Sequence, residues 1–201
     1  EAERRIACSY YMNVPENPQG SRFPRKDSQP IRLAATVILL RAAQAGVEVF
    51  LVRRNSRSAF APDAYVFPGG AMDPQDASLE ETALRELREE SGVALAGPGS
   101  LAKFSHWITP PHEPRRFDTH FFIAQLPDGQ IAQADTRETH DGLWIRPAEA
   151  LKRKQAGTLH LVYPTMKHLE RLSQFDSIAA LKAYTRTKRI VTISPDFSHA
   201  D

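Results

Sequence analysis

Two spacings of hydrophobic residues run along the chain, one typical of strands and one typical of helices. Residues 31–40 (IRLAATVILL) form an apolar run rich in β-branched side chains, and residues 47–54 (VEVFLVRR) alternate between apolar and polar. Because Gly46 closes the short segment between them, the two runs predict a hairpin or a pair of neighbouring strands. Aromatic and β-branched residues predict further strands at 65–67, 103–109, 117–126 and 142–146.

Turn and cap residues separate these elements. Residues 55–64 are expected to form a loop, and Pro68-Gly69-Gly70 to form a break that ends the preceding strand. Ser78 and Glu81 fit a capping box and Gly92 fits a C-terminal cap, which together predict a helix over 79–91. Helical spacing recurs at 147–157, 164–175 and 177–184. Interleaved helices and strands, with several strands adjacent in sequence, indicate an α/β fold with a mixed sheet covered by helices.

The chain of 201 residues is expected to form one main domain with shorter flanking segments. Residues 1–30 carry four prolines among polar groups and are predicted to form an extended arm. The domain is predicted over 31–185, followed by a tail at 186–201. Hydrophobic residues at 41% and charged residues at 25% are ordinary globular values, so a disordered or fibrous chain is not favoured.

Charge and cysteine content narrow the function classes. The formal net charge is only +2 and the basic residues are scattered, which argues against nucleic acid as the main partner and favours an acidic small molecule. The single cysteine, Cys8, excludes an internal disulfide and fits a reducing compartment. The longest apolar run, 33–40, is far shorter than a membrane span, and no signal peptide is recognisable, so we expect a cytoplasmic protein with no membrane partner.

The predicted helix at 79–91 carries an unusual concentration of acid. Glu86, Glu89 and Glu90 share an arc of roughly 100° on one helix face, where like charges repel. Arg85 offsets part of that charge, and the remainder suits a hard divalent cation, Mg²⁺ or Mn²⁺, which prefers carboxylate oxygens. The alternative is an ordinary solvated acidic face. The glycines at 69–70 favour a ligand site, because their backbone can approach a ligand closely.

The same residues resemble the signature of the Nudix hydrolases, G-x5-E-x7-R-E-U-x-E-E-x-G-U, in which U is aliphatic. Gly70 supplies the leading glycine, and the second half is matched at every specified place by Arg85, Glu86, Leu87, Glu89, Glu90, Gly92 and Val93. The loop in the first half is one residue longer than in the signature. Asp76 stands where the signature has a Glu, and is the nearest candidate for the carboxylate that supports the arginine.

The resemblance extends over about residues 31–185 and implies a Nudix-type mixed β-sheet sandwiched between α-helices. The segments FPGGAMDPQD, WITP and RRFDTHFF are similar to the branch that includes peroxisomal coenzyme A diphosphatases. The motif of coenzyme A cleaving members has an Arg and a Gly upstream of FPGG, where this chain has Ala59 and Asp63. The substrate of that branch is therefore not transferred to this chain.

The resemblance also implies a reaction, in which water attacks a diphosphate that joins a nucleoside to another moiety, as in coenzyme A, ADP-ribose or a dinucleotide. Metal ligands would be Glu86, Glu89, Glu90 and the carbonyl of Gly70, and Arg85 would orient the carboxylates. Either Glu86 or Glu138 would be the general base. Contacts with the substrate are expected from Arg54, Arg115, Arg116 and Asp118, because arginine suits bidentate phosphate binding.

Several alternatives stay open at this stage. A Nudix-fold module that binds its ligand without catalysis is the main rival to an enzyme, and the oligomeric state is undetermined, with a homodimer as one option. The histidines have no metal-ligand spacing and are expected in polar core or surface positions: His106, His112, His120 and His140. Phe60, Trp107 and Phe117 could stack on a base, but core packing is the favoured expectation.

Overall fold

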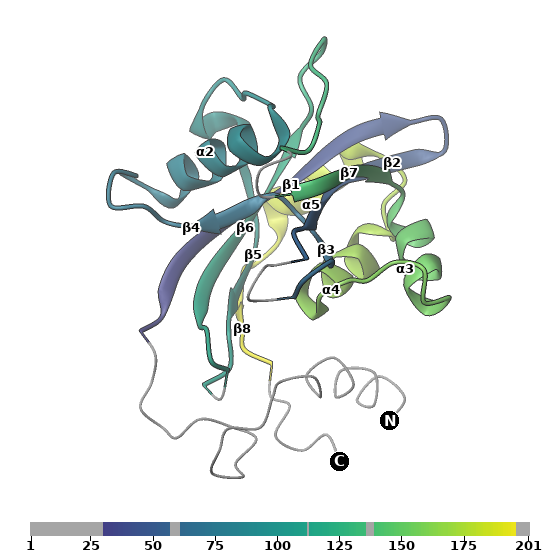
Figure 1. The fold of residues 1–201 in the computed structure, drawn as a ribbon. Helices are drawn as coiled ribbons and strands as arrows, with labels where there is room; N and C mark the ends of the chain where they lie inside the picture. Colours follow the sequence, from purple (N-terminus) through teal and green to yellow (C-terminus); the bar gives the residue numbers. More distant parts are fainter. Residues whose placement is uncertain (1–29, 57–60, 112, 136–138, 196–201) are drawn as a thin grey trace.

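The structure, a computed structural model, describes residues 30–56, 61–111, 113–135 and 139–195 (Figure 1). Its strands are β1 (Arg32–Ala43), β2 (Gly46–Arg54), β3 (Tyr65–Val66), β4 (Gly69–Ala71), β5 (Ala102–Ile108), β6 (Phe117–Gln125), β7 (Thr139–Ile145) and β8 (Thr192–Ile193). Its helices are α2 (Leu79–Ser91), the short 3-10 helix η1 (Pro98–Ser100), α3 (Pro147–Gln155), α4 (Tyr163–Leu172) and α5 (Ile178–Thr187).

The strands form one mixed sheet whose main path is β3-β2-β1-β6-β5-β8. β1 and β2 form an antiparallel hairpin, one of the two arrangements predicted for them, and β1 pairs with β6 in parallel. β4 adds to β1, and β7 adds to β2. β1 is therefore central, which explains why its sequence is a nearly continuous apolar run.

Helices cover both faces of the sheet, as expected for the predicted sandwich (Figure 1). On one face Val37 of β1 packs in the same core cluster as Leu87 of α2. On the other face Ile38 packs with Leu169 of α4 and Leu181 of α5. Since neighbouring residues of a strand point to opposite faces, β1 contributes to both cores at once. The predicted α/β class and the mixed sheet between helices are confirmed.

Helix α2 begins and ends where its cap residues predict. The Ser78 hydroxyl accepts a hydrogen bond from the Glu81 N–H, and the Glu81 carboxylate accepts one from the Ala77 N–H. Gly92 adopts a left-handed conformation (φ 70°), and its N–H donates to the Arg88 carbonyl. Such caps each stabilise a helix by about 1 kcal/mol. They fix the helical phase, and with it the direction of the acidic face.

Two predictions about local structure need correction. Gly69 and Gly70 do not form a bend; they belong to strand β4, which pairs antiparallel with Ala34–Thr36 of β1. No strand was predicted beyond α5, yet β8 pairs in parallel with β5 at the edge of the sheet. Both errors have one cause, because very short strands are defined by their partners and not by their own sequence.

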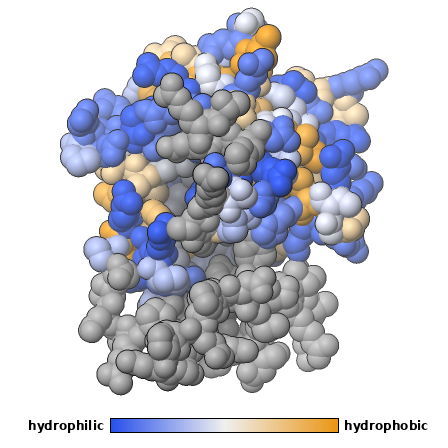
Figure 2. All heavy atoms as spheres, in the orientation of Figure 1, coloured by the Kyte–Doolittle hydropathy of each residue, from blue (hydrophilic) through white to orange (hydrophobic). Residues whose placement is uncertain are grey.

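No helix in the described ranges is long and apolar enough to cross a bilayer. On the face drawn in Figure 2, hydrophilic residues cover most of the described surface and apolar residues form separate patches. The predicted arm at 1–30 lies outside the described residues, except for Pro30.

Candidate active site

A cleft of about 660 Å³ lies where β1, β4 and β6 meet α2 and the start of α4. Its lining includes carboxylates, arginines, apolar residues and the threonines Thr36, Thr119 and Thr165. The carboxylates are Asp73, Glu86, Glu89 and Glu90, and the arginines are Arg32, Arg54, Arg85 and Arg115. Apolar and aromatic residues complete the wall, among them Phe67, Phe117, Phe121, Val162 and Pro164. The volume is that of a small-molecule site.

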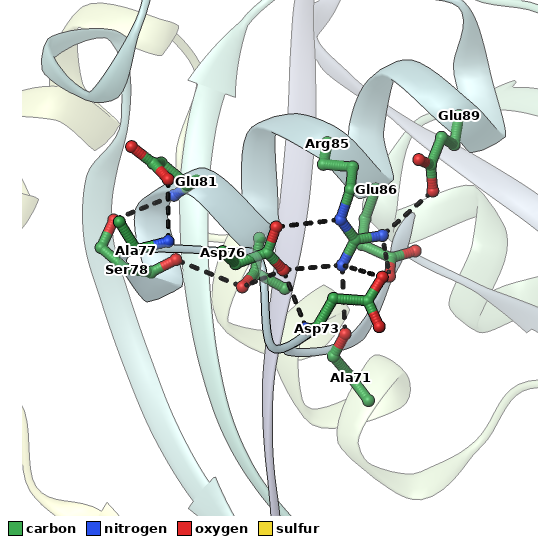
Figure 3. Close-up of polar contacts among 10 residues, drawn as sticks. Ala71, Asp73, Asp76, Ala77, Ser78, Glu81, Arg85, Glu86 and Glu89 are labelled. Carbon is green, nitrogen blue, oxygen red and sulfur yellow. Dashed lines mark hydrogen bonds and ion pairs between the residues drawn. The ribbon is translucent and has the colours of Figure 1, made fainter.

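Arg85 connects several acidic groups in and beside this cleft (Figure 3). Its Nε and Nη2 donate to the two carboxylate oxygens of Asp76 at 3.1 and 2.9 Å, a bidentate contact. Its Nη1 donates to Glu86 at 2.8 Å and to Glu89 at 3.0 Å, and Nη2 also reaches the Ala71 carbonyl at 3.2 Å. With every nitrogen engaged, the guanidinium fixes the orientation of the acidic residues around it.

Asp76 is the carboxylate that supports Arg85, so the contact predicted from the sequence is present despite the longer loop. Asp76 also accepts from the Thr82 hydroxyl at 3.0 Å and from the Asp73 N–H at 2.9 Å. The hydrogen bonds from Arg85 are the main cause that lowers the pKa of Asp76 to about 2. Asp76 and Glu86 in turn raise the pKa of Arg85, so this ion pair stays charged at neutral pH.

Gly69 and Gly70 are needed for close packing. A Cβ on Gly69 would lie 2.5 Å from the Ala35 carbonyl oxygen and 2.6 Å from the Thr36 Cα. A Cβ on Gly70 would collide with the carboxylate of Glu86. The Gly69 N–H donates to Glu90 at 2.9 Å. Strand β4 therefore holds two acidic side chains of α2 directly against its backbone.

The three glutamates of α2 (Glu86, Glu89 and Glu90, here the α2 glutamates) offer only oxygen ligands, the donor chemistry that Mg²⁺ and Mn²⁺ prefer. Arg85 holds two of them and the Gly69 N–H holds the third. They are not gathered within 4.8 Å as a group in the described part of the chain. The Glu89 side chain is 51% exposed. This set of residues fits a hard divalent cation.

The cleft contains some of the predicted substrate residues and not others. Arg54 and Arg115 line it, together with Arg32, which the sequence did not single out. Arg116 and Asp118 are not among its lining residues; the Arg116 Nε donates to the Thr109 carbonyl at 3.3 Å. Arg32 enters because it pairs with Phe117 in the parallel β1–β6 register. The place of Arg32 in the cleft could be predicted only from that strand register.

Aromatic residues divide between core and cleft. Trp107 is buried in the core, as expected, with 8% of its surface exposed. Phe117, for which core packing was also the favoured expectation, instead lines the cleft. Phe60 lies outside the described residues, and so does Glu138, the alternative general base.

Asp118 lies with two histidines on the other face of β6. His106 Nε2 is 2.5 Å from the Asp118 carboxylate, and His120 Nε2 is 3.5 Å from it. The two imidazole rings stack with their centres 4.2 Å apart. Burial is the main cause that lowers the pKa of His120. Polar core or surface positions were expected for the histidines, but cross-strand pairing gathers these two. The side chains of His112 and His140 lie outside the description.

Comparison with known proteins places the chain among related sequences and structures. A family model for the NUDIX domain matches residues 30–165. "Putative nudix hydrolase 7" of Caenorhabditis elegans is 29% identical, over 82% of this chain and 68% of its own length. Acyl-coenzyme A diphosphatase NUDT19 of Xenopus laevis is 22% identical, over 68% of this chain and 62% of its own length. A crystal structure of a NUDIX hydrolase from Alicyclobacillus acidocaldarius is similar, with a TM-score of 0.71 at 27% identity, covering 83% of this chain and 99% of that one.

Proposed function

Because this chain belongs to the Nudix hydrolase family and is a pyrophosphohydrolase of phosphoanhydride bonds, we propose that it cleaves the diphosphate of a nucleotide linked to a second moiety. Coenzyme A, ADP-ribose and dinucleotides are compounds of this chemical class. One observation carries the proposal. The α2 glutamates and three arginines from other elements, Arg32, Arg54 and Arg115, line the same cleft.

The arginines supply the contacts with the substrate's phosphates. A diphosphate is dianionic or more at neutral pH, and guanidinium groups bind its oxygens through bidentate hydrogen bonds. Arg32 and Arg115 belong to adjoining segments, since Arg32 pairs with Phe117. Arg54 lies at the end of β2. A diphosphate bound here would contact arginines from more than one element of the fold.

The acidic side of the cleft is proposed to hold the divalent cation. Glu86, Glu89, Glu90 and the Gly70 carbonyl are the proposed ligands, supported by the donor chemistry and by the packing of β4 against Glu86 and Glu90. When bound, Mg²⁺ or Mn²⁺ would neutralise the diphosphate and lower the pKa of a bound water. Arg85 orients the carboxylates through its contacts with Glu86 and Glu89.

A carboxylate must accept the proton that the attacking water loses. Glu86 and Glu138 both stay candidates, because Glu86 is within the cleft and Glu138 is outside the described residues. The leaving group is a nucleoside monophosphate or the phosphorylated second moiety. Phe117, on the cleft wall, is placed to contact the apolar face of a base.

One ion pair beside the cleft is a reason not to name coenzyme A as the specific substrate. Asp63 occupies one of the two positions at which the coenzyme A motif differs from this chain, and it pairs with Arg53 at 2.7 Å. That ion pair adjoins Arg54 in the sequence, next to the cleft. Glycine at this position could not form that ion pair, so the pocket of coenzyme A cleaving relatives is not assumed here.

A substrate panel tests the proposal. The full chain would be incubated with coenzyme A, acyl-coenzyme A, ADP-ribose, NAD-type and diadenosine substrates, with Mg²⁺, with Mn²⁺ and with excess EDTA, and products would be identified by mass spectrometry. We expect metal-dependent release of two phosphorylated products from at least one compound, abolished by EDTA. Tight binding of a panel compound without cleavage, with either metal, would contradict the proposal and favour the non-catalytic binding module.

A further inference from the structure

His106, Asp118 and His120 (the β5–β6 triad) place two imidazoles and one carboxylate around a common point. One ligand atom from each residue lies within 4.8 Å of the others. In the described ranges no other group of three His, Cys, Asp or Glu residues is gathered so closely. None of the three lines the cleft, so the substrate chemistry proposed above does not use this cluster.

The backbone holds these residues in register. His106 on β5 and His120 on β6 are direct cross-strand partners, and Asp118 precedes His120 by two residues and so points to the same face. β5 and β6 pair along most of their length, with one irregularity between Lys103 and Ser105. A site built on paired strands is held more rigidly than one built on loops.

The hydrogen bonding of the cluster favours a shared cation. Both Nε2 atoms approach the same Asp118 oxygen, at 2.5 and 3.5 Å, so their interactions with it compete. His106 Nδ1 lies 2.8 Å from the Thr192 hydroxyl on β8. Without an ion, the 2.5 Å contact requires His106 Nε2–H to donate to Asp118. With an ion bound, the Thr192 hydroxyl can accept from Nδ1–H, so that the Nε2 lone pair is available to the ion. Ligating histidines commonly have such a partner on the second nitrogen.

We propose that the β5–β6 triad is a binding site for a divalent transition-metal ion of the Zn²⁺ type, separate from the cleft. Two imidazoles and a carboxylate with one open position are an established ligand set for such ions. Tetrahedral ligation at about 2.0–2.1 Å separates ligand atoms by roughly 3.3 Å, so Asp118 must withdraw slightly from His106. The three side chains are 18–29% exposed, which leaves a path for entry.

A bound ion would fasten the edge of the sheet. It would join β5 to β6 directly, and β8 indirectly through Thr192 and His106. Lys103 is a nearby positive charge, but it is paired with Glu80 at 3.3 Å, which reduces its repulsion of the ion. The stability of the protein should therefore rise with zinc concentration by mass action.

The test uses the full chain, stripped of metal and kept in excess Mg²⁺ so that the α2 glutamates are occupied by a hard cation. Co²⁺ is titrated while its visible absorption is followed, and Zn²⁺ is then added to displace it. We expect one equivalent of bound Co²⁺ with imidazole ligation, displaced by Zn²⁺. His120→Ala should weaken Zn²⁺ binding at least tenfold, and Thr192→Val should weaken it less.

Glu89→Gln is the matched control, because it removes a carboxylate from the cleft and should leave the Zn²⁺ affinity unchanged. Asp118→Asn is a second test variant that keeps the shape of the site if His120→Ala folds poorly. The proposal is overturned if the wild-type chain binds no Zn²⁺ below millimolar concentration. It is equally overturned if Asp118→Asn and His120→Ala both retain wild-type affinity, or if Glu89→Gln removes the tight site.

Discussion

The α2 glutamates and the β5–β6 triad both gather potential metal ligands, and the fold assembles them in opposite ways. The glutamates lie three and four residues apart on one helix, so a single capped helix positions them. The triad exists only because β5 and β6 pair with His106 opposite His120. One cluster depends on local spacing, and the other depends on tertiary register.

The surroundings of the two clusters also differ. The α2 glutamates are negatively charged oxygen donors, and the fold compensates that charge with Arg85, which is itself held by Asp76. The β5–β6 triad contains two groups that are neutral when unprotonated and a single carboxylate. Hard cations suit the first set and borderline transition-metal ions suit the second. The comparison teaches that donor type alone would give the two proposed sites of this small domain different metal preferences.

The largest expected effect is the loss of hydrolysis when an α2 glutamate is neutralised. Glu89→Gln or Glu90→Gln should reduce kcat/KM by at least about a hundredfold, the scale seen when one preorganised charged group is removed from a site. Folding should stay near normal, because Glu89 is half exposed and glutamine keeps the shape. Steady-state kinetics and thermal unfolding measure the two quantities.

Glu81→Gln is the control for that prediction, since Glu81 is an exposed acid of the same helix and glutamine can still accept from the Ala77 N–H. Its activity should match the wild type. Wild-type kcat/KM in both Glu89→Gln and Glu90→Gln would remove the metal-ligand assignment from α2.

The next largest effect separates the two glycines that face this helix. In Gly69→Ala the new methyl meets backbone atoms of β1, which cannot move away, so the free energy of unfolding should fall by about 1–3 kcal/mol. In Gly70→Ala it meets the Glu86 carboxylate, which can move, so activity should fall more than stability. Urea unfolding and kinetics on both variants would test this. Equal stability losses with equal activity losses would contradict the distinction.

The elements predicted from the sequence are those set by nearby residues, and the elements missed are those set by pairing with distant strands. Helix α2 covers the predicted range, because Ser78, Glu81 and Gly92 are local signals that set its two ends. The β1–β2 hairpin was predicted from its alternation and Gly46. Strands β4 and β8 were not, since three and two residues carry no pattern of their own and become strands only beside β1 and β5.

The candidate site divides in the same way. The contact between Asp76 and Arg85 could be anticipated, because both lie in one short loop and helix. Arg32 could not, because its place in the cleft depends on the parallel pairing of β1 with β6. Asp118, predicted to contact the substrate, is not among the lining residues of the cleft, and the pairing of β6 with β5 places it beside His106.

An effect of intermediate size is expected on the pH dependence of the free energy of unfolding, through Asp76. The pKa of Asp76 is lowered from 3.8 to about 2 in the folded protein, so its ionised form favours folding. This shift corresponds to about 2 kcal/mol, which is fully present above pH 4 and is lost as the pH falls toward 2. Asp76→Asn should therefore be less stable than the wild type at pH 7, and the difference should shrink as the pH falls through this range.

Urea unfolding at several pH values measures that difference, with Asp73→Asn as the control. Asp73 is 3.9 Å from Arg85 and its side chain is 61% exposed, so its replacement should cost much less. A constant gap between wild type and Asp76→Asn from pH 7 to pH 2.5 would show that packing, and not the charge of Asp76, accounts for the loss.

The smallest expected effect completes the comparison of the two clusters. With Mg²⁺ as the only divalent metal, His120→Ala should keep kcat/KM within about twofold of the wild type and lose less than about 1 kcal/mol of stability. The reason is that His120 does not line the cleft and is part of no core cluster. The same kinetic assay used for Glu89→Gln measures it. A hundredfold loss here would mean that the two clusters act on one reaction, because strand register would then couple β6 to the cleft through Phe117 and Thr119, which alternate with Asp118 and His120.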